Sequence, residues 1–388
     1  TSAVFCLEDA VRDEAVPEAD FILKEWVVDG DVVAPDESNT YTLVVKQATQ
    51  VKAVFVRDVY EQTIPLARGW NWVSTFMQES LPFGEFTQYA DRILSQTDEL
   101  FRDPELGLMG GIDALAPGVA YKVSTNTRFS RNLRGHLHNG ELNLVKGWNW
   151  VAYPYFKENK LSVMANAEVG DIISSQVGFA EFADDTWEGT LTTMTPGNGY
   201  LYKSASEKVL SFNFTATPDA SRSDVVTRYL LPAGNTTDID IHEYPSTMNV
   251  TARIFRDGVE QPGQNYNLYA MAGNELRGIG QYIGQNYYIT IYGEDPVEIG
   301  FIVEEAETGN ACLAEQTLTF RSDVVGSRKA PFALDMPSTT GIDLLNSNQQ
   351  MTVYSLEGIL VSRDATMKTL CRLPRGVYIV NGRKCFVK

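Results

Sequence analysis

The chain has 388 residues, a formal net charge of −18 and 44% hydrophobic residues. At about 100–150 residues per domain, this length predicts about three or four domains rather than one core. The acidic balance argues against nucleic acid as a partner, because phosphate binding needs a basic face. The sequence has no apolar run of about 18 residues and no signal peptide, so no transmembrane segment is expected, and the start at Thr1 indicates a processed or trimmed chain.

Residues 1–60 are predicted to form a small β unit. Trp26-Val27-Val28 leads into Asp29-Gly30, a dipeptide typical of hairpin turns. Tyr41 to Lys46 and Val51 to Phe55 have the composition of strands, with polar turn residues between them. This arrangement resembles the divergent internalin B-type repeats of bacterial surface proteins.

The pentapeptide Gly-Trp-Asn-Trp-Val occurs twice, at Gly69 to Val73 and at Gly147 to Val151. A self-similar period of this length indicates a duplicated domain, with copies at 61–139 and 140–217. Because side chains alternate along a strand, both indoles of each copy are expected on the same side of it. The match resumes further along the chain, in Ile93 to Gln96 with Ile173 to Gln176, and in Pro117-Gly118 with Pro196-Gly197.

Between the Trp strand and the Pro-Gly turn, each copy has a more polar stretch with helical spacing. The apolar residues that fit one helix face are Phe86, Tyr89, Ile93 and Leu94 in copy 1, and Leu161, Met164 and Ile172 in copy 2. Each copy is therefore predicted to be mostly β with one or two short helices. The copies resemble the Gly-Trp-Asn-Trp modules of Bacteroidetes-type secreted and surface proteins.

Residues 218–335 are predicted to form a β-sandwich of antiparallel strands. Long alternating segments separated by Gly and Asn turns support this prediction. A linker rich in Gly, Ser and Pro is expected over 324–340. The segments are Asn265 to Ala270, Gly278 to Tyr282, Tyr287 to Tyr292 and Val297 to Val303.

The last segment, 341–388, carries seven Lys/Arg against three Asp/Glu, so the charge changes sign there. Val353 to Gly358 and Leu373 to Val380, followed by the turn dipeptide Asn381-Gly382, are similar to the C-terminal sorting domains of proteins exported by the Bacteroidetes type IX pathway. The resemblance implies a small Ig-like β-sandwich. Cys371 and Cys385 stand at strand positions that are usually aliphatic, and either a bridge or two buried thiols fits them.

Few residues suggest a catalytic or metal-binding site. His136 and His138 would share a strand face near Glu141, and could bind a metal, but a solvated strand is the favoured interpretation. The acidic clusters Asp184-Asp185 and Glu304-Glu305-Glu307 could serve as glycosidase carboxylates or calcium ligands, and solvated charge is favoured for both. We predict no catalytic residue, no cofactor and no metal.

The tryptophans allow two interpretations. Paired indoles on a strand could stack on sugar rings, but the repetition of the motif with its flanks favours a role in core packing. Trp187 differs, because it replaces Leu108 of copy 1 and follows Asp184-Asp185 at an expected loop. Trp187, Asp184 and Asp185 are therefore the candidate ligand-binding residues.

The leading hypothesis is a non-enzymatic secreted or cell-surface protein of tandem β modules. Its loops would serve adhesion or capture of an extracellular protein or glycan. Solubility from the acidic body favours a monomer. The main rival is a set of accessory domains at the C-terminal end of a larger secreted enzyme, because Ala3-Val4-Phe5 repeats Ala53-Val54-Phe55 and so indicates an earlier module.

Overall fold

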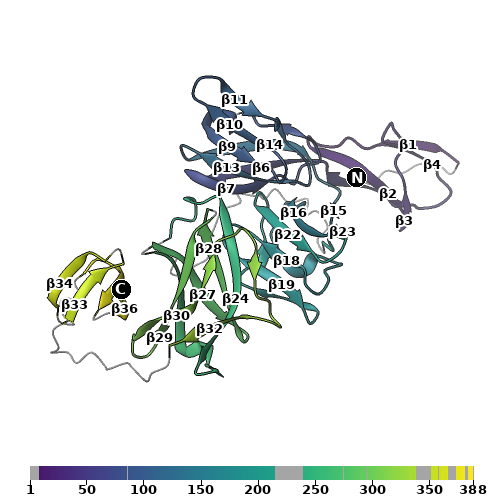
Figure 1. Ribbon diagram of the computed structural model, residues 1–388. Coiled ribbons are helices and arrows are strands. Elements are labelled where there is room, and N and C mark those ends of the chain that lie inside the picture. The colour runs from purple at the N-terminus through teal and green to yellow at the C-terminus, as the bar shows by residue number, and fades with distance from the viewer. Residues whose placement is uncertain are drawn as a thin grey trace.

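The computed structural model confirms that the protein is mainly β, with almost no helix. Figure 1 shows the N-terminal unit at one end, the two copies next to it, a curled sheet beside them, and a small C-terminal sheet. The structure describes residues 8–84, 86–214, 239–273, 275–294, 296–337, 351–356, 358–365, 373–380 and 383–387, the last range without side chains.

The N-terminal unit is a small sheet of order β3-β2-β5 beside a separate β1–β4 pair. Its core is slight: Trp26 is 3% exposed and packs with Ala15 and Leu23. Asp29 and Gly30 both have positive φ, +50° and +98°, which suits a two-residue hairpin turn between β2 and β3. The strands are β1 (Ala10–Glu14), β2 (Phe21–Val28), β3 (Asp31–Val33), β4 (Thr40–Val44) and β5 (Val51–Arg57).

The two copies have the same topology. The five-stranded sheet runs β11-β10-β9-β13-β7 in copy 1 and β20-β19-β18-β22-β16 in copy 2. Copy 1 also pairs β6 with β14 and β8 with β12, and copy 2 pairs β15 with β23 and β17 with β21. Copy 1 comprises β6 (Val59–Leu66), β7 (Gly69–Ser74), β8 (Leu81–Pro82), α1 (Phe86–Tyr89), β9 (Ala90–Leu94), β10 (Glu99–Asp103), β11 (Gly107–Gly110), β12 (Ala114–Leu115), β13 (Ala120–Thr125) and β14 (Phe129–His136). Copy 2 comprises β15 (Glu141–Leu144), β16 (Gly147–Ala152), β17 (Asn159–Lys160), η1 (Leu161–Val163), β18 (Ile172–Ser174), β19 (Phe179–Ala183), β20 (Thr186–Gly189), β21 (Thr193–Met194), β22 (Gly199–Ser204) and β23 (Lys208–Ser211).

The buried side chains of the two copies form one continuous cluster. Tyr60 of copy 1 and Phe156 of copy 2 touch across it, with ring centroids 4.9 Å apart. The expected helices are only single turns, because Ile93 and Ile172 lie in strands that pair with β13 and β22. Pairing in the sheet satisfies backbone groups that a short helix would leave open.

The third region is a single curled sheet of order β25-β24-β28-β27-β26-β29-β30, shown in green in Figure 1. The sequence predicted a sandwich, but here β27 pairs with β26 through its first half and with β28 through its second, so neighbouring strands are linked continuously. The change of pairing partner falls at two glycines. A Cβ would lie 2.8 Å from Thr290 O at Gly278 and 3.1 Å from Leu268 Cβ at Gly280. The strands are β24 (Ser246–Arg256), β25 (Val259–Glu260), β26 (Tyr266–Ala272), β27 (Glu275–Ile283), β28 (Asn286–Gly293), β29 (Glu298–Glu305) and β30 (Ala311–Thr319), with the short helix η2 (Gly263–Asn265).

The expected linker over 324–340 is in large part structure. β31 (Val324–Val325) and β32 (Phe332–Met336) pair in parallel with β24. β32 also lies beside β30, where the amide of Gln316 bonds the backbone N–H and carboxylate of Asp335. The two ends of the curled sheet therefore meet, and the buried core lies inside the curl.

The C-terminal sheet has order β34-β33-β35-β36. Val377 packs against Met271 and Ile302 of the curled sheet, so the two are in contact. Cys312 is a half-buried free thiol, whereas Cys6, Cys371, the side chain of Cys385 and the Asn381-Gly382 turn lie outside the described residues. The strands are β33 (Met351–Ser355), β34 (Leu360–Ala365), β35 (Gly376–Val380) and β36 (Arg383–Val387).

Candidate functional site

The asparagine of each Gly-Trp-Asn-Trp motif holds the turn before its own strand. In copy 1, Asn71 Oδ1 accepts from Ala67 N (2.9 Å) and Nδ2 donates to Ala67 O and Gly69 O (both 2.8 Å). Asn149 makes the same bonds around Gly147. Both glycines have positive φ, +91° and +98°, which other residues rarely adopt. Gly and Asn therefore recur for the same local reason.

The four indoles point away from the buried cluster that the two copies share. Trp72 is 3% exposed, while Trp70, Trp148 and Trp150 are half-buried, and none belongs to that cluster. The predicted burial is confirmed for Trp72, but the prediction that the four indoles pack in the core of their own copy was wrong. The inward positions of the strand are taken by Asn71 and Val73, so the indoles lie on the outer face of the sheet.

A lysine lies between indoles of different copies. Lys122 Nζ is 4.5 Å from the ring centroid of Trp72 and 4.7 Å from that of Trp150. In copy 2, Lys203 Nζ lies 5.4 Å from the ring centroid of Trp148 and 2.9 Å from Asp323 Oδ1. Cation–π contacts of this kind are strongest where they are shielded from water, and Lys122 is 3% exposed.

The copies exchange equivalent hydrogen bonds. A glutamine at the end of the repeated Ile93–Gln96 and Ile173–Gln176 blocks reaches the Trp strand of the other copy. The bonds are Gln96 Nε2 to Trp148 O (2.7 Å), Trp150 N to Gln96 Oε1 (2.8 Å), Gln176 Nε2 to Trp70 O (2.8 Å) and Trp72 N to Gln176 Oε1 (3.1 Å). Reciprocal contacts of this kind define an isologous, two-fold arrangement.

The Pro-Gly turns take part in the same interface. Ser74 N donates to Gly197 O (2.9 Å), and Ala152 N donates to Gly118 O (3.0 Å). Three of the blocks that repeat in the sequence are thus brought together: the Trp strand, the Gln block and the Pro-Gly turn. Sequence reasoning found these blocks but assigned the glutamines no role, although their repetition was a usable signal.

The curled sheet covers the outer face of copy 2. Asn249 Nδ2 donates to Ser174 Oγ (2.8 Å), and Tyr288 packs on Phe179 with centroids 5.6 Å apart. Arg328, from the segment expected to be a linker, donates to Glu181 Oε2 through its backbone N–H (2.7 Å). Its guanidinium bonds Ala183 O (2.5 Å), Thr186 O (3.2 Å) and Glu188 Oε2 (3.3 Å).

The short segment that precedes β24 of the curled sheet contacts copy 1. Trp70 N donates to His242 O (2.7 Å), and Trp72 Nε1 donates to Pro245 O (3.2 Å). A Cβ at Gly69 would lie 2.3 Å from His242 O, so this close contact also requires glycine. The indoles thus contact both the other copy and the third region.

The candidate ligand residues lie on the β19–β20 hairpin. Asp184 and Asp185 are its two turn residues, both with positive φ (+52° and +57°), and both are exposed. Asp184 forms an ion pair with Lys329 (Oδ1–Nζ 3.0 Å). Trp187 is half-buried and packs against Phe182 and the shared cluster, with its indole N–H buried and no acceptor among the described residues. Trp187 was expected in a loop, but it lies in β20, where its side chain faces the shared cluster.

The two histidines have different surroundings. His136 is exposed; its Nδ1 contacts Glu79 and its Nε2 lies 3.3 Å from Asp58 Oδ2. The hydrogen bond to Glu79 and the nearby Asp58 charge raise the pKa of His136. His138 is half-buried, and burial lowers its pKa. Among the described residues no group of His, Cys, Asp and Glu side chains is placed to hold a metal ion.

The acidic residues that could have been glycosidase or calcium groups do not converge. Glu304 is buried and accepts from Tyr269 OH (2.9 Å). Glu305 pairs with Arg256 (3.0 Å), and Glu307 is exposed. The buried carboxylate therefore has structural partners.

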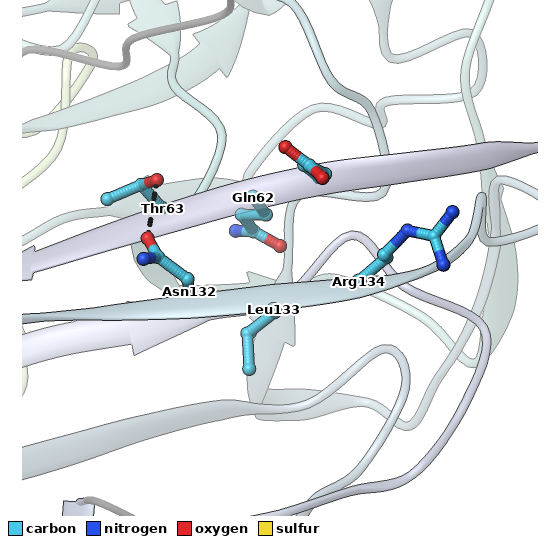
Figure 2. A pocket seen from close by; sticks show the side chains of 6 residues that line it. Gln62, Thr63, Asn132, Leu133 and Arg134 are labelled. Carbon is cyan, nitrogen blue, oxygen red and sulfur yellow. Dashed lines mark hydrogen bonds between the residues drawn. The ribbon is translucent and has the colours of Figure 1, made fainter. Parts of the chain in front are cut away.

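A polar hollow of about 350 Å³ lies on the β6–β14 ribbon. Figure 2 shows Thr63 and Asn132 side by side on the two strands, joined by a 2.8 Å hydrogen bond, with Arg134 further along. Glu61 also lines the hollow, and Arg134 forms an ion pair with Asp20. Its lining includes hydroxyl, amide, carboxylate and guanidinium groups, which suit a polar ligand.

Comparison with protein-family models, curated proteins and solved structures finds no match for this chain. Within the part of the chain that the structure describes, no helix is long and apolar enough to cross a membrane.

Proposed function

We propose that the chain is a non-enzymatic secreted or cell-surface protein whose tandem β modules present loops for adhesion or ligand capture. Its partner is an extracellular protein or a glycan. One observation carries the proposal: the repeated motif residues are engaged in holding the copies to one another and to the curled sheet. The repeats thus supply a scaffold, and ligand contacts fall to surfaces outside the motif.

The resemblances support the location and the finer architecture. The Gly-Trp-Asn-Trp modules are similar to those of Bacteroidetes-type secreted and surface proteins, and 341–388 is similar to type IX sorting domains. On this proposal the chain is a series of small β modules, followed by the curled sheet and an Ig-like sorting-like domain. Export then places it in the medium or on the outer surface of the cell.

Two surfaces are open to a ligand. The first is the hollow on β6–β14, where Thr63 and Asn132 offer hydroxyl and amide groups of the kind that bind sugar hydroxyls. The second is the β19–β20 turn, where Asp185 is exposed beside Asp184, while Trp187 supports the hairpin from its inner side. The hollow is the better candidate, because residues from two strands line it.

The test is a glycan array and a panel of extracellular matrix proteins, probed with the full chain. For any ligand found, the Thr63→Ala/Asn132→Ala double variant is expected to weaken binding by about tenfold or more. Thr319→Ala, at an exposed position of β30, is the control.

The second surface has its own pair of variants. Asp185→Ala tests the β19–β20 turn, and Asp257→Ala is matched to it, since both are exposed positive-φ aspartates in hairpin turns. Binding that neither surface affects would contradict the assignment of these surfaces. Reproducible turnover of a polysaccharide or protein substrate by the purified chain would contradict the proposed function itself.

A further inference from the structure

The β10–β11 hairpin of copy 1 carries exposed apolar side chains on both of its faces and at its tip. A cluster of exposed apolar side chains on one hairpin often marks a binding surface, since burying such side chains in a contact is favourable. The exposed fractions are 37% for Phe101, 71% for Leu106, and 40% each for Leu108 and Met109.

The equivalent hairpin of copy 2 is covered. Gly110 pairs with Leu100 just as Gly189 pairs with Ala180, so β11 corresponds to β20. At the positions of Phe101 and Met109, copy 2 has Glu181 and Glu188, and Arg328 bonds both. The same surface of the module is therefore a protein-binding surface, already occupied in copy 2.

Among the residues that the structure describes, β11 is also the outermost strand of its sheet and pairs with β10 alone. Natural edge strands are usually protected by lysine, proline or a covering segment. In copy 2 Arg328 covers the end of the equivalent hairpin by bonding the carbonyl groups of Ala183 and Thr186, the pair that closes it. The sequence of β11 is Gly-Leu-Met-Gly, without a charge or a proline. Its edge is thus suited to pairing with another strand.

We propose that two copies of the chain associate through β11, joining their five-stranded sheets edge to edge about a two-fold axis. A second copy is the occupant because an antiparallel pairing of β11 with itself is self-complementary. When Met109 lies opposite Met109 of the second copy, each Leu108 lies opposite Gly110 of the other copy. Because Gly110 has no side chain, there is room for the leucine. Since Phe101 already pairs with Met109, an apolar row then crosses all four strands.

The charge of the chain sets how the association responds to salt. Each copy carries −18, so two copies repel one another at low ionic strength. Added salt screens that repulsion without weakening the apolar contact. The dimer is therefore expected at high protein concentration, and more of it at about 0.5 M than at about 0.05 M salt.

Sedimentation velocity of the full chain tests the proposal over about 1 to 300 μM, a range that brackets weak association. The sedimentation coefficient of the wild type should rise with concentration. Met109→Lys places two lysines opposite one another across the axis, and their repulsion should weaken association by at least about tenfold. The control is Val259→Lys, at a position of the curled sheet that is 63% exposed. A wild type that stays monomeric throughout, or a Met109→Lys variant that associates like it, overturns the proposal.

Cross-linking tests the register. Side chains directly opposite one another across a strand pair have Cβ atoms about 4.5–5.5 Å apart, so Met109→Cys should give a covalent dimer with a short bis-maleimide. Val259→Cys and the wild type control for the native cysteines. Dimer yield from Met109→Cys no higher than from these two overturns the register and the contact through β11.

Discussion

At the scale of single residues, the repeated motif is explained by backbone needs rather than by a binding site. Asn71 and Asn149 each hold a turn in which a glycine has positive φ. A short polar side chain that bonds its own backbone does so at little cost in entropy. The indoles on either side are then free to face neighbouring parts of the chain.

Replacing Asn71 with alanine is expected to destabilise the protein by about 2–3 kcal/mol, because buried groups of the turn lose their partner. Asn149→Ala should cost a similar amount. Asn143→Ala, at an exposed position of β15, is the matched control and should change little. Urea denaturation measures the difference, and equal stability of Asn71→Ala and Asn143→Ala would refute the role of the turn.

At the scale of elements, the strand edges in the middle of the molecule are completed by other elements. The edge of β7 receives Gln176 and that of β16 receives Gln96, each from a loop of the other copy. The carbonyl groups that close the β19–β20 hairpin receive Arg328 from the curled sheet. Side chains thus do for these edges what a further strand would do in a larger sheet.

Removing one glutamine should open one edge only. In Gln176→Ala, the backbone amide of Trp72 loses its acceptor and should exchange its hydrogen about tenfold faster, as expected for a bond worth about 1.4 kcal/mol. In Gln96→Ala, the amide of Trp150 should respond instead. Each variant is the control for the other in residue-resolved hydrogen exchange. If both amides changed together in either variant, the bonds would not be separate as described.

The sequence predicted the elements better than their contacts. The repeat and the Asp29-Gly30 turn follow from local chemistry, and the strand character of the chain follows from its composition. The outward facing of Trp72 could not be predicted, because alternation places two indoles on one side of a strand without saying which side is buried. The role of 324–336 was missed because Gly, Ser and Pro suggest a linker, whereas parallel pairing with β24 depends on distant residues.

At the scale of the whole molecule, the N-terminal unit is joined to copy 1 by charged contacts. Asp20 pairs with Arg134, and Asp58, between β5 and β6, lies beside His136. Glu79 of copy 1 contacts the same imidazole. Because the imidazole changes charge near neutral pH and the guanidinium does not, the two contacts should respond differently to pH.

The pKa of His136 is raised in the folded protein above its ordinary value of about 6.5. The charged imidazole therefore stabilises the fold fully below about pH 6.5, and this contribution is lost as the pH rises through the raised pKa. The melting temperature of the wild type should exceed that of His136→Gln at about pH 5.5, and the gap should close by about pH 9. Arg134→Gln is the control, with a gap that stays level over this range. A gap for His136→Gln that widens with pH would contradict the assignment.

The reciprocal pairing of the copies has a consequence for how they can diverge. In a dimer of identical chains, every substitution appears on both sides of the axis, and assembly depends on dilution. Here both halves belong to one polypeptide, so they meet at a high effective concentration whatever the amount of protein. Each half is also free to specialise: Glu188 accepts Arg328 in one, while Met109 stays exposed at the same place in the other. Because they are covalently linked, the two copies can keep a two-fold interface and still carry different residues at equivalent surface positions.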